Sequence, residues 1–411
     1  MSSENQINTA AEPRMAAGTL SSKPRFEILD GLRGVAAMIV VVFHLFETYS
    51  PGPCEQILNH GYLAVDFFFI LSGFVIGYAY DDRWGRMSQW EFYKRRLIRL
   101  QPMVILGTLI GAFWFYFGDS PDFPLVAATP WWKVFLIILL GCIMFPTPPA
   151  MDIRGWQEIN SLNGAAWSLM WEYVANILYA TVVRRFGRVV LTVFVSISAL
   201  LTISLCCNLD LFGLLAARSA AAYTAIGGFG LSPDQLYIGI CRLLYPFFCG
   251  LLIYRIGLRL NIRKGGFLWC SVALALLLCM PHIGGSQPNM LNGVYCAAAI
   301  LILFPCIVAA GAGSPLEGKK TVAVCKFLGS ISYPLYITHY PMIYVQMNWA
   351  ARHPDAPAST HIWVAAWIFL ASVAVAYASL KVYDLPVRRW LSERFIHRIP
   401  YTKITASNDK D

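Results

Sequence analysis

Long apolar runs separated by short polar clusters dominate the chain. Most of these runs approach the ~20 residues that a helix needs to cross the hydrocarbon core of a membrane. The pattern therefore predicts an all-α polytopic membrane protein with about ten transmembrane helices. The candidate spans are 32–49, 62–80, 102–118, 163–183, 189–208, 236–257, 266–282, 291–312, 326–349 and 362–382.

Composition supports this reading. Hydrophobic residues make up 57% of the 411 residues and charged residues only 13%, against about 25% charged residues in typical soluble proteins. The net charge of +9 resides largely in loops between apolar runs, where it sets orientation. We therefore expect a multi-pass protein of the plasma (inner) membrane that is surrounded by lipid and has no nucleic acid partner.

An eleventh apolar piece, 133–145, is too short to be an ordinary span. Basic loops face the cytoplasm, and all of them do so only if 102–183 contains an even number of crossings. We therefore predict that 133–145 is a short re-entrant or interfacial helix, and that both termini are cytoplasmic. The basic clusters used in this argument lie at 83–99, 184–188, 255–264 and 319–326.

Polar segments flank a single membrane domain. Residues 1–24 lack the apolar core of a signal peptide, and we expect them to form a disordered cytoplasmic N-terminal tail. Residues 25–392 form the predicted transmembrane domain, and 393–411 form a predicted cytoplasmic C-terminal tail.

The first span contains two ionisable groups, Arg33 and His44. A charged group deep in a membrane costs on the order of 2.5–3.5 kcal/mol on insertion scales, so it is rarely kept without a partner or a task. The eleven-residue separation places His44 about 16 Å above Arg33 and nearly on the same helix face. His44 is either a hydrogen-bonded core histidine or a functional group.

Helix rise predicts a shared depth for four polar residues. With alternating span directions, His44, Asp66, Glu172 and His339 all fall roughly 10 Å below the outer membrane face. Structural polar residues have little reason to agree in depth, so the agreement favours a site with acid and base groups.

A second set of polar residues is basic and lies at the predicted cytoplasmic mouth. Guanidinium groups bind phosphate oxygens bidentately, so this set suits a phosphate-bearing ligand. The alternative is that these residues only set orientation. The set consists of Arg33, Arg95, Arg96, Arg99, Arg388 and Arg389.

Six motifs in order resemble those of the membrane-bound acyltransferase-3 family over about residues 26 to 390. They read LDGLRGVAAMIVVVFH, GYLAVDFFFILSGFVI, RRLIRLQP, WSLMWE, SYPLYITH and YDLPVRR. The resemblance implies an integral membrane O-acyltransferase, most often an O-acetyltransferase, that uses an acyl-coenzyme A donor on carbohydrates or other hydroxylated acceptors.

The resemblance also implies roles for particular residues. The essential histidine and arginine of the family's first helix correspond to His44 and Arg33. The basic motif proposed to hold the coenzyme A phosphates falls on Arg95, Arg96 and Arg99, and the tryptophan-serine-leucine motif with its acid falls on Trp167, Ser168 and Glu172. Asp384 stands where the family commonly has glutamate, which leaves its role open.

Together these readings give a mechanistic hypothesis. Acyl-CoA, with acetyl-CoA favoured, binds from the cytoplasm, and His44 acts as general base on an acceptor hydroxyl. Either Asp66 or Glu172 orients His44, and Tyr336, His339 or Ser168 binds the acceptor or the developing oxyanion. A covalent acyl-histidine remains open, and no metal is expected.

The main alternative is a transporter of a lipid-linked or small anionic solute that uses a His/Asp/Glu proton relay. A polytopic sensor or scaffold is a third class, but it leaves the shared depth unexplained. A glycan, a lipid-linked glycan or a small metabolite each remain open as the acceptor, and succinyl or longer chains as the acyl group.

Overall fold

The computed structural model describes residues 23, 25–216, 218 and 221–396. Over this part of the chain all regular structure is helical, which confirms the all-α prediction. The predicted tails, 1–24 and 393–411, lie mostly outside the described residues and stay predictions. The helices are α1 (Glu27–Glu47), α2 (Ala64–Tyr80), α3 (Gln89–Phe115), α4 (Leu125–Ala128), α5 (Trp131–Cys142), α6 (Trp167–Thr181), α7 (Arg188–Cys206), α8 (Pro233–Ile256), α9 (Gly266–Cys279), α10 (Met290–Ala298), α11 (Phe304–Gly313), α12 (Lys319–Arg352), α13 (Ala358–Ala378) and α14 (Leu385–Phe395).

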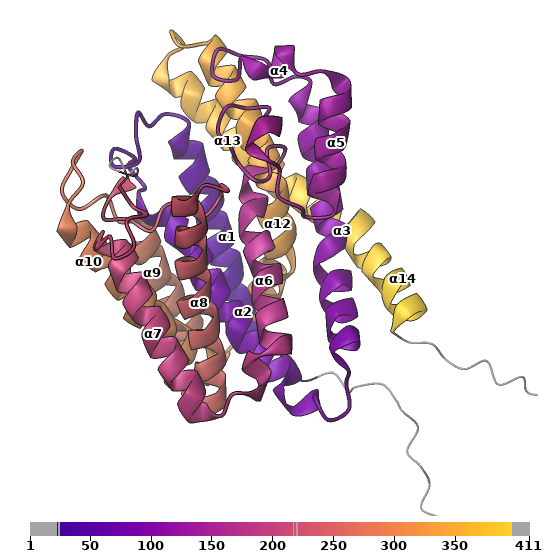
Figure 1. Ribbon diagram of the computed structural model, residues 1–411. Helices are drawn as coiled ribbons and strands as arrows, with labels where there is room; N and C mark the ends of the chain where they lie inside the picture. The colour runs from indigo at the N-terminus through magenta and orange to yellow at the C-terminus, as the bar shows by residue number, and fades with distance from the viewer. Residues whose placement is uncertain (1–22, 24, 217, 219–220, 397–411) are drawn as a thin grey trace, which may run out of the picture.

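Seven helical stretches among the described residues are long and apolar enough to cross a membrane. Three of them are composite: 3₁₀ turns extend α2 at both ends to give His60–Arg83, and π segments join α10 to α11 and α13 to α14 without a break. Three further helices that are not among the seven, α6, α9 and α12, run beside them in the same bundle (Figure 1). The polytopic membrane architecture is thus confirmed, while the number of ten spans is not tested by this count.

Prolines explain the two π segments. A proline inside a helix removes one backbone hydrogen bond and clashes with the carbonyl group four residues earlier. The π segment Ala299–Leu303 ends just before Pro305, and Ser379–Asp384 ends just before Pro386. Widening the turn relieves the clash, so each helix continues through its proline.

Glycines let two helix pairs approach closely. A Cβ atom on Gly73 of α2 would lie 1.7 Å from the carbonyl oxygen of Phe247 in α8, and one on Gly250 would lie 2.0 Å from that of Ile70. A Cβ atom on Gly34 of α1 would similarly lie 2.5 Å from Cβ of Leu328 in α12. Small residues at such crossings are the usual means of close helix packing in membranes. These two contacts fix which side chains face one another across each pair.

The segment between α3 and α6 dips into the bundle. A Cβ atom on Gly141, near the end of α5, would lie 2.8 Å from Thr108 in the body of α3. The following loop reaches equally deep, because the Asn163 amide donates to the carbonyl oxygen of Ile337 in mid α12, at 2.8 Å. α6 therefore starts inside the bundle and not at its surface.

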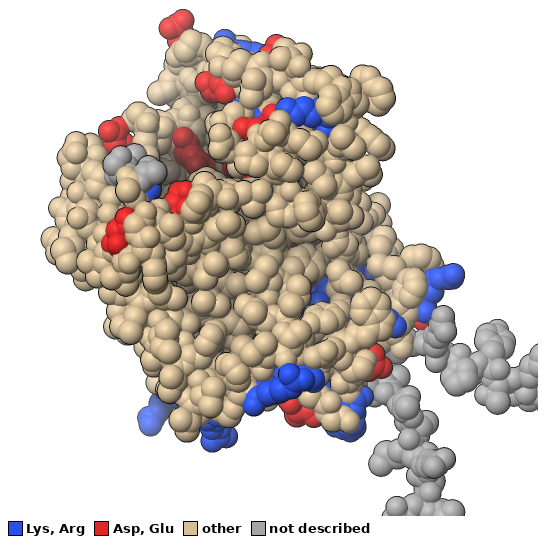
Figure 2. Space-filling model, in the orientation of Figure 1, with Lys and Arg blue, Asp and Glu red and all other residues tan. Residues whose placement is uncertain are grey.

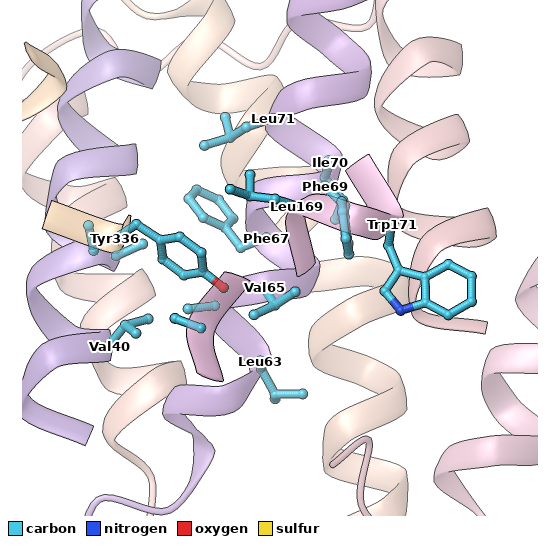
Figure 3. Packing of buried hydrophobic residues seen from close by; sticks show 14 of the residues in the cluster. Val40, Leu63, Val65, Phe67, Phe69, Ile70, Leu71, Leu169, Trp171 and Tyr336 are labelled. Atoms are coloured by element: carbon cyan, nitrogen blue, oxygen red, sulfur yellow. The ribbon is translucent and has the colours of Figure 1, made fainter. Parts of the chain in front are cut away.

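On the face drawn in Figure 2, exposed charges lie mostly toward the two ends of the bundle. Figure 2 shows a broad band free of charge on this face, with basic side chains concentrated below it. Beneath the surface lies one large apolar core, and Figure 3 shows Val40 of α1, Phe67 of α2 and Tyr336 of α12 in it. We call the end that holds Arg33, Arg96 and Arg99 the basic end, and the opposite end, which holds Glu47, the upper end.

Candidate functional site

His44 lies in the last turn of α1 and is held by a carboxylate of the same helix. Its Nδ1 lies 2.6 Å from Oε2 of Glu47, three residues later, so the two side chains share one face. A carboxylate only accepts hydrogen bonds, so Nδ1 carries the proton and Nε2 is left for another partner. The side chains are 18% and 39% exposed, so the pair opens toward the upper end.

His339 of α12 lies opposite His44. The two imidazole rings are 5.4 Å apart between centroids, and the Tyr340 ring packs edge-on against His44 at 4.8 Å. Nδ1 of His339 lies 3.1 Å and 2.9 Å from the carbonyl oxygens of Leu335 and Tyr336. His339 is fully buried, and its Nε2 has no hydrogen-bond partner among the described residues.

Asp66 of α2 is paired with an arginine that the sequence analysis did not select. Nη2 of Arg242 in α8 donates to Oδ2 of Asp66 at 2.8 Å, and both side chains are almost completely buried. The guanidinium also donates to the carbonyl oxygens of Tyr62 and Gly227 and lies 5.0 Å from the ring centroid of Trp167. This buried ion pair ties α2 and α8 to the start of α6.

Ser168 and Tyr336 meet below the two histidines. Their hydroxyl oxygens are 2.7 Å apart, and both side chains are buried. The Tyr336 ring is 5.9 Å from that of His339. Three of the expected supporting residues, Ser168, Tyr336 and His339, thus form one connected group, whereas the fourth, Trp167, lies against Arg242.

Glu172 lies deeper than its sequence position suggested. Its Oε1 accepts from Nη2 of Arg96 at 2.7 Å and from the hydroxyl of Ser72. Ser72 is six residues, about 9 Å, further along α2 than Asp66. The prediction of a depth shared by four residues is therefore wrong for Glu172, because α6 begins inside the bundle and carries this carboxylate toward the basic end.

The contacts also correct the expected partner of His44. Asp66 and Glu172, the two carboxylates proposed to orient it, are each bound to an arginine, and the carboxylate on His44 is Glu47. Glu47 follows His44 closely in the chain, so its helical spacing of three was a usable signal.

At the basic end several arginines gather. Arg33 donates to Asp30 at 2.8 Å and to the Ser332 hydroxyl at 2.9 Å, which fixes its guanidinium against α12. Arg99 lies 5.9 Å from the Tyr333 ring centroid and close enough to Arg33 and Arg388 for their charges to interact.

Two further groups complete this end. Asp384 accepts from Arg388 at 2.9 Å and is almost fully buried. Arg95 lies one residue before Arg96 on α3, and the Nε atoms of both are buried without a partner among the described residues. The end therefore carries positive charge that its own carboxylates do not neutralise fully.

A third charged group, Arg154 with Glu158, lies on the loop that precedes α6. Arg154 is buried with its guanidinium 3.5 Å from the Tyr344 ring centroid, and the Tyr344 hydroxyl donates to Glu158 at 3.3 Å. Burial is the main reason that the pKa of Glu158 rises from 4.5 to about 7, and the negative charge of Glu47 raises it further. Burial likewise lowers the pKa of Arg154.

Sequence reasoning missed Arg242, Glu47, Tyr340 and Glu158. Arg242 interrupts the apolar run YIGICRLLYPFF, so the argument that selected Arg33 would have selected it too. Glu158 lies in an irregular polar loop that offered no periodic signal. Among the described residues no group of three or more His, Cys, Asp or Glu side chains could hold a metal ion.

Comparison with known proteins agrees with the resemblance seen in the motifs. A family model described as an acyltransferase domain matches residues 26–381. The chain is 33% identical over 167 residues to "Protein 2 in picA locus" of Rhizobium radiobacter, covering 39% of this chain and 83% of that protein.

Two further relatives carry names that refer to acetyl transfer. The "Putative peptidoglycan O-acetyltransferase YrhL" of Bacillus subtilis (strain 168) is 24% identical over 405 residues, which is 92% of this chain and 58% of that protein. The "Putative O-acetyltransferase SACOL0978" of Staphylococcus aureus (strain COL) is 39% identical over 82 residues, 19% of this chain and 12% of that protein. The chain thus spans little more than half of one of these proteins and a small part of the other. No solved structure matches the chain.

Proposed function

The chain belongs to the acyltransferase-3 family, and from this premise we propose that it is an integral membrane O-acyltransferase that moves an acyl group from cytoplasmic acyl-CoA to an acceptor hydroxyl. The observation that carries the proposal is the arrangement of His44. Its Nδ1 is bound to Glu47, and its Nε2 has no hydrogen-bond partner among the described residues. A histidine held in this way is prepared to accept a proton at Nε2.

In the proposed reaction His44 takes the proton of the acceptor hydroxyl. The acceptor oxygen attacks the thioester carbonyl carbon, the carbon–sulfur bond breaks, and the departing thiolate receives the proton from His44. Glu47 stabilises the imidazolium that exists between these steps, as a carboxylate does in other acyl-transfer sites. The hydroxyls of Tyr336 and Ser168, which lie 2.7 Å apart, are candidates to donate to the developing oxyanion.

A covalent alternative uses the same atoms. In it Nε2 of His44 attacks the thioester carbon first and the carbon–sulfur bond breaks to release the thiolate. The acceptor oxygen then attacks the acyl carbon, the carbon–nitrogen bond to His44 breaks, and the hydroxyl proton balances the charge of the thiolate. Rapid quenching during the first turnover distinguishes the two routes, because an acyl-histidine accumulates only in the second.

The basic end is the proposed donor site. Arg95 and Arg99 have charge to offer phosphate groups. Arg33 and Arg96, also proposed for this site, share their charge with Asp30 and Glu172. Arg33 and His44 lie on one helix about 16 Å apart, a span suited to the extended arm of coenzyme A. Acetyl is the proposed acyl group because two relatives are named for acetyl transfer.

We further propose that ten helical segments cross the membrane and that both termini are cytoplasmic. α5 is excluded from the crossings because it is short and its end lies beside Thr108, in the body of α3. The basic loops then share one side. With this orientation the upper end faces away from the cytoplasm and admits the acceptor, a glycan or lipid-linked glycan of the cell envelope.

The test is acetyl transfer by purified protein in liposomes with radiolabelled acetyl-CoA. We expect His44→Ala to lose turnover by a factor of about 10² to 10⁴ while it still binds coenzyme A. The matched control is His361→Ala, a partly exposed histidine whose ring contacts Tyr49 and Trp349 among the described residues. Wild-type protein that neither binds nor consumes any acyl-CoA would contradict the proposal and favour solute transport.

A further inference from the structure

Hydrogen bonding fixes the tautomer of His339. Its Nδ1 faces the carbonyl oxygens of Leu335 and Tyr336, and carbonyl oxygens only accept. Nδ1 must therefore carry the proton, which leaves Nε2 as a bare acceptor. The side chain is fully buried, and this nitrogen is unpartnered among the described residues. A buried acceptor without a donor is costly, so it is rarely retained without a ligand or a water to satisfy it.

The same tautomer argument applies to His44, whose Nδ1 donates to Glu47. The two rings, 5.4 Å apart between centroids and 31° from parallel, therefore present two unprotonated Nε2 atoms from facing helices. Neither imidazole can donate to the other in this state. A ligand that satisfies both nitrogens must bring two hydrogen-bond donors close together.

We propose that His339 binds a second hydroxyl group of the acceptor, next to the hydroxyl that reacts at His44, and so selects acceptors with adjacent hydroxyl groups. This inference rests on the proposed function, because it assumes that His44 meets the reacting hydroxyl. The two donors are then the paired O–H groups of a 1,2-diol such as those on a sugar ring.

The surroundings of the two rings fit such a ligand. Tyr340 packs edge-on against His44 at 4.8 Å and lies 5.9 Å from His339 between ring centroids. Aromatic rings beside a few convergent polar groups are typical of small-molecule sites. The hydroxyl of Tyr336, one turn below His339 on the same helix, already bonds to Ser168, so it leaves Nε2 of His339 unsatisfied.

The experiment compares acyl transfer from acetyl-CoA to methyl glucoside and to its monodeoxy analogues, with hydrolysis by water as the reference. We expect wild-type protein to prefer the intact diol by about tenfold, the usual value of one neutral hydrogen bond. His339→Asn keeps an amide donor near the backbone carbonyls but has no Nε2 atom. It should lose this preference, and an unchanged melting temperature would show that the fold is kept.

A second measurement needs no variant. The ¹⁵N resonance of Nε2 of His339 in detergent-solubilised wild-type protein should move when methyl glucoside is added, and less with the deoxy analogues. Equal use of all glycosides by the wild type, no use of any, or a preference that survives in His339→Asn would overturn the inference. If the wild-type protein does not hydrolyse acetyl-CoA at all, the proposed function itself would be contradicted.

Discussion

Two acid–base pairs in the upper half of the bundle differ in how completely their polar atoms are hydrogen-bonded and shielded from solvent. Arg242 and Asp66 are sealed: their side chains are 2% and 0% exposed, and the guanidinium donates to two backbone carbonyls besides the carboxylate. His44 and Glu47 are open, with 18% and 39% of their side chains exposed. The neighbouring His339 keeps a nitrogen without a partner among the described residues.

The difference separates structural from reactive polar groups. Burying a charge is costly, and a buried pair is retained when every polar atom finds a partner. Such a pair holds helices together but has no capacity left for a substrate. A site for chemistry needs the opposite: groups held in place on one side and unsatisfied on the other. By this criterion we propose a structural role for Asp66 and a reactive role for His44, with His339 beside it.

The strongest test of the comparison is Arg242→Met. It leaves Asp66 as a buried unpaired charge and two carbonyl oxygens without their donor, so the free energy of unfolding should fall by about 3–5 kcal/mol. In Asp66→Leu/Arg242→Met most of this loss should be recovered, since no charge is left unpaired. Thermal unfolding in detergent measures both. A stable Arg242→Met protein that lacks transferase activity would instead indicate that this pair takes part in the reaction.

The open pair is tested by Glu47→Gln. This change removes the charge beside His44 but alters no buried contact, because Glu47 is more than a third exposed. We expect acyl transfer to fall by about 10- to 100-fold, the worth of one hydrogen bond to a charged group, with an unchanged melting temperature. Unchanged transfer would show that another group supports His44.

Glu172→Gln tests whether the carboxylate near the basic end mainly stabilises the fold, as the buried Arg242–Asp66 pair is expected to do. It removes the charge that holds Arg96, whose side chain is 14% exposed. We expect the unfolding free energy to fall by about 1–3 kcal/mol, with little change in the acceptor concentration that gives half-maximal rate. Steady-state kinetics and melting curves on the same preparation check both. A loss of turnover as large as that of His44→Ala, without destabilisation, would restore a catalytic role for Glu172.

The smallest expected effect is a pH-dependent change in the free energy of unfolding, caused by Glu158. Its pKa is about 7 in the folded protein against 4.5 for a free carboxyl, so the folded state binds its proton more tightly. Stability from this group is therefore full below pH 4.5 and is lost as the pH rises through 7. Because Glu158 keeps some solvent contact, we expect a loss of roughly 1–2 kcal/mol.

In Glu158→Gln that pH dependence should disappear. Melting temperatures at pH 5 and pH 8 are compared in the wild type and the variant. At pH 8 the variant should be the more stable of the two. An identical pH dependence in both proteins would mean that the carboxyl of Glu158 titrates normally.

The sequence by itself determined the class of fold and the first helix of the site. Whether a segment enters a membrane depends on its own composition and length, so the apolar runs and the motif containing Arg33 and His44 were sufficient. The position of Glu47 was also implicit, since residues three apart on a helix are neighbours.

Only the tertiary structure decided which polar groups meet. Asp66 and Arg242 are 176 residues apart, and they meet because Gly73 and Gly250 let α2 and α8 touch. The depth of Glu172 depends on a loop that dips into the bundle before α6. His339 faces His44 because α1 and α12 are in close contact at Gly34. Helix docking depends on shapes contributed by distant parts of the chain, and no local pattern encodes it.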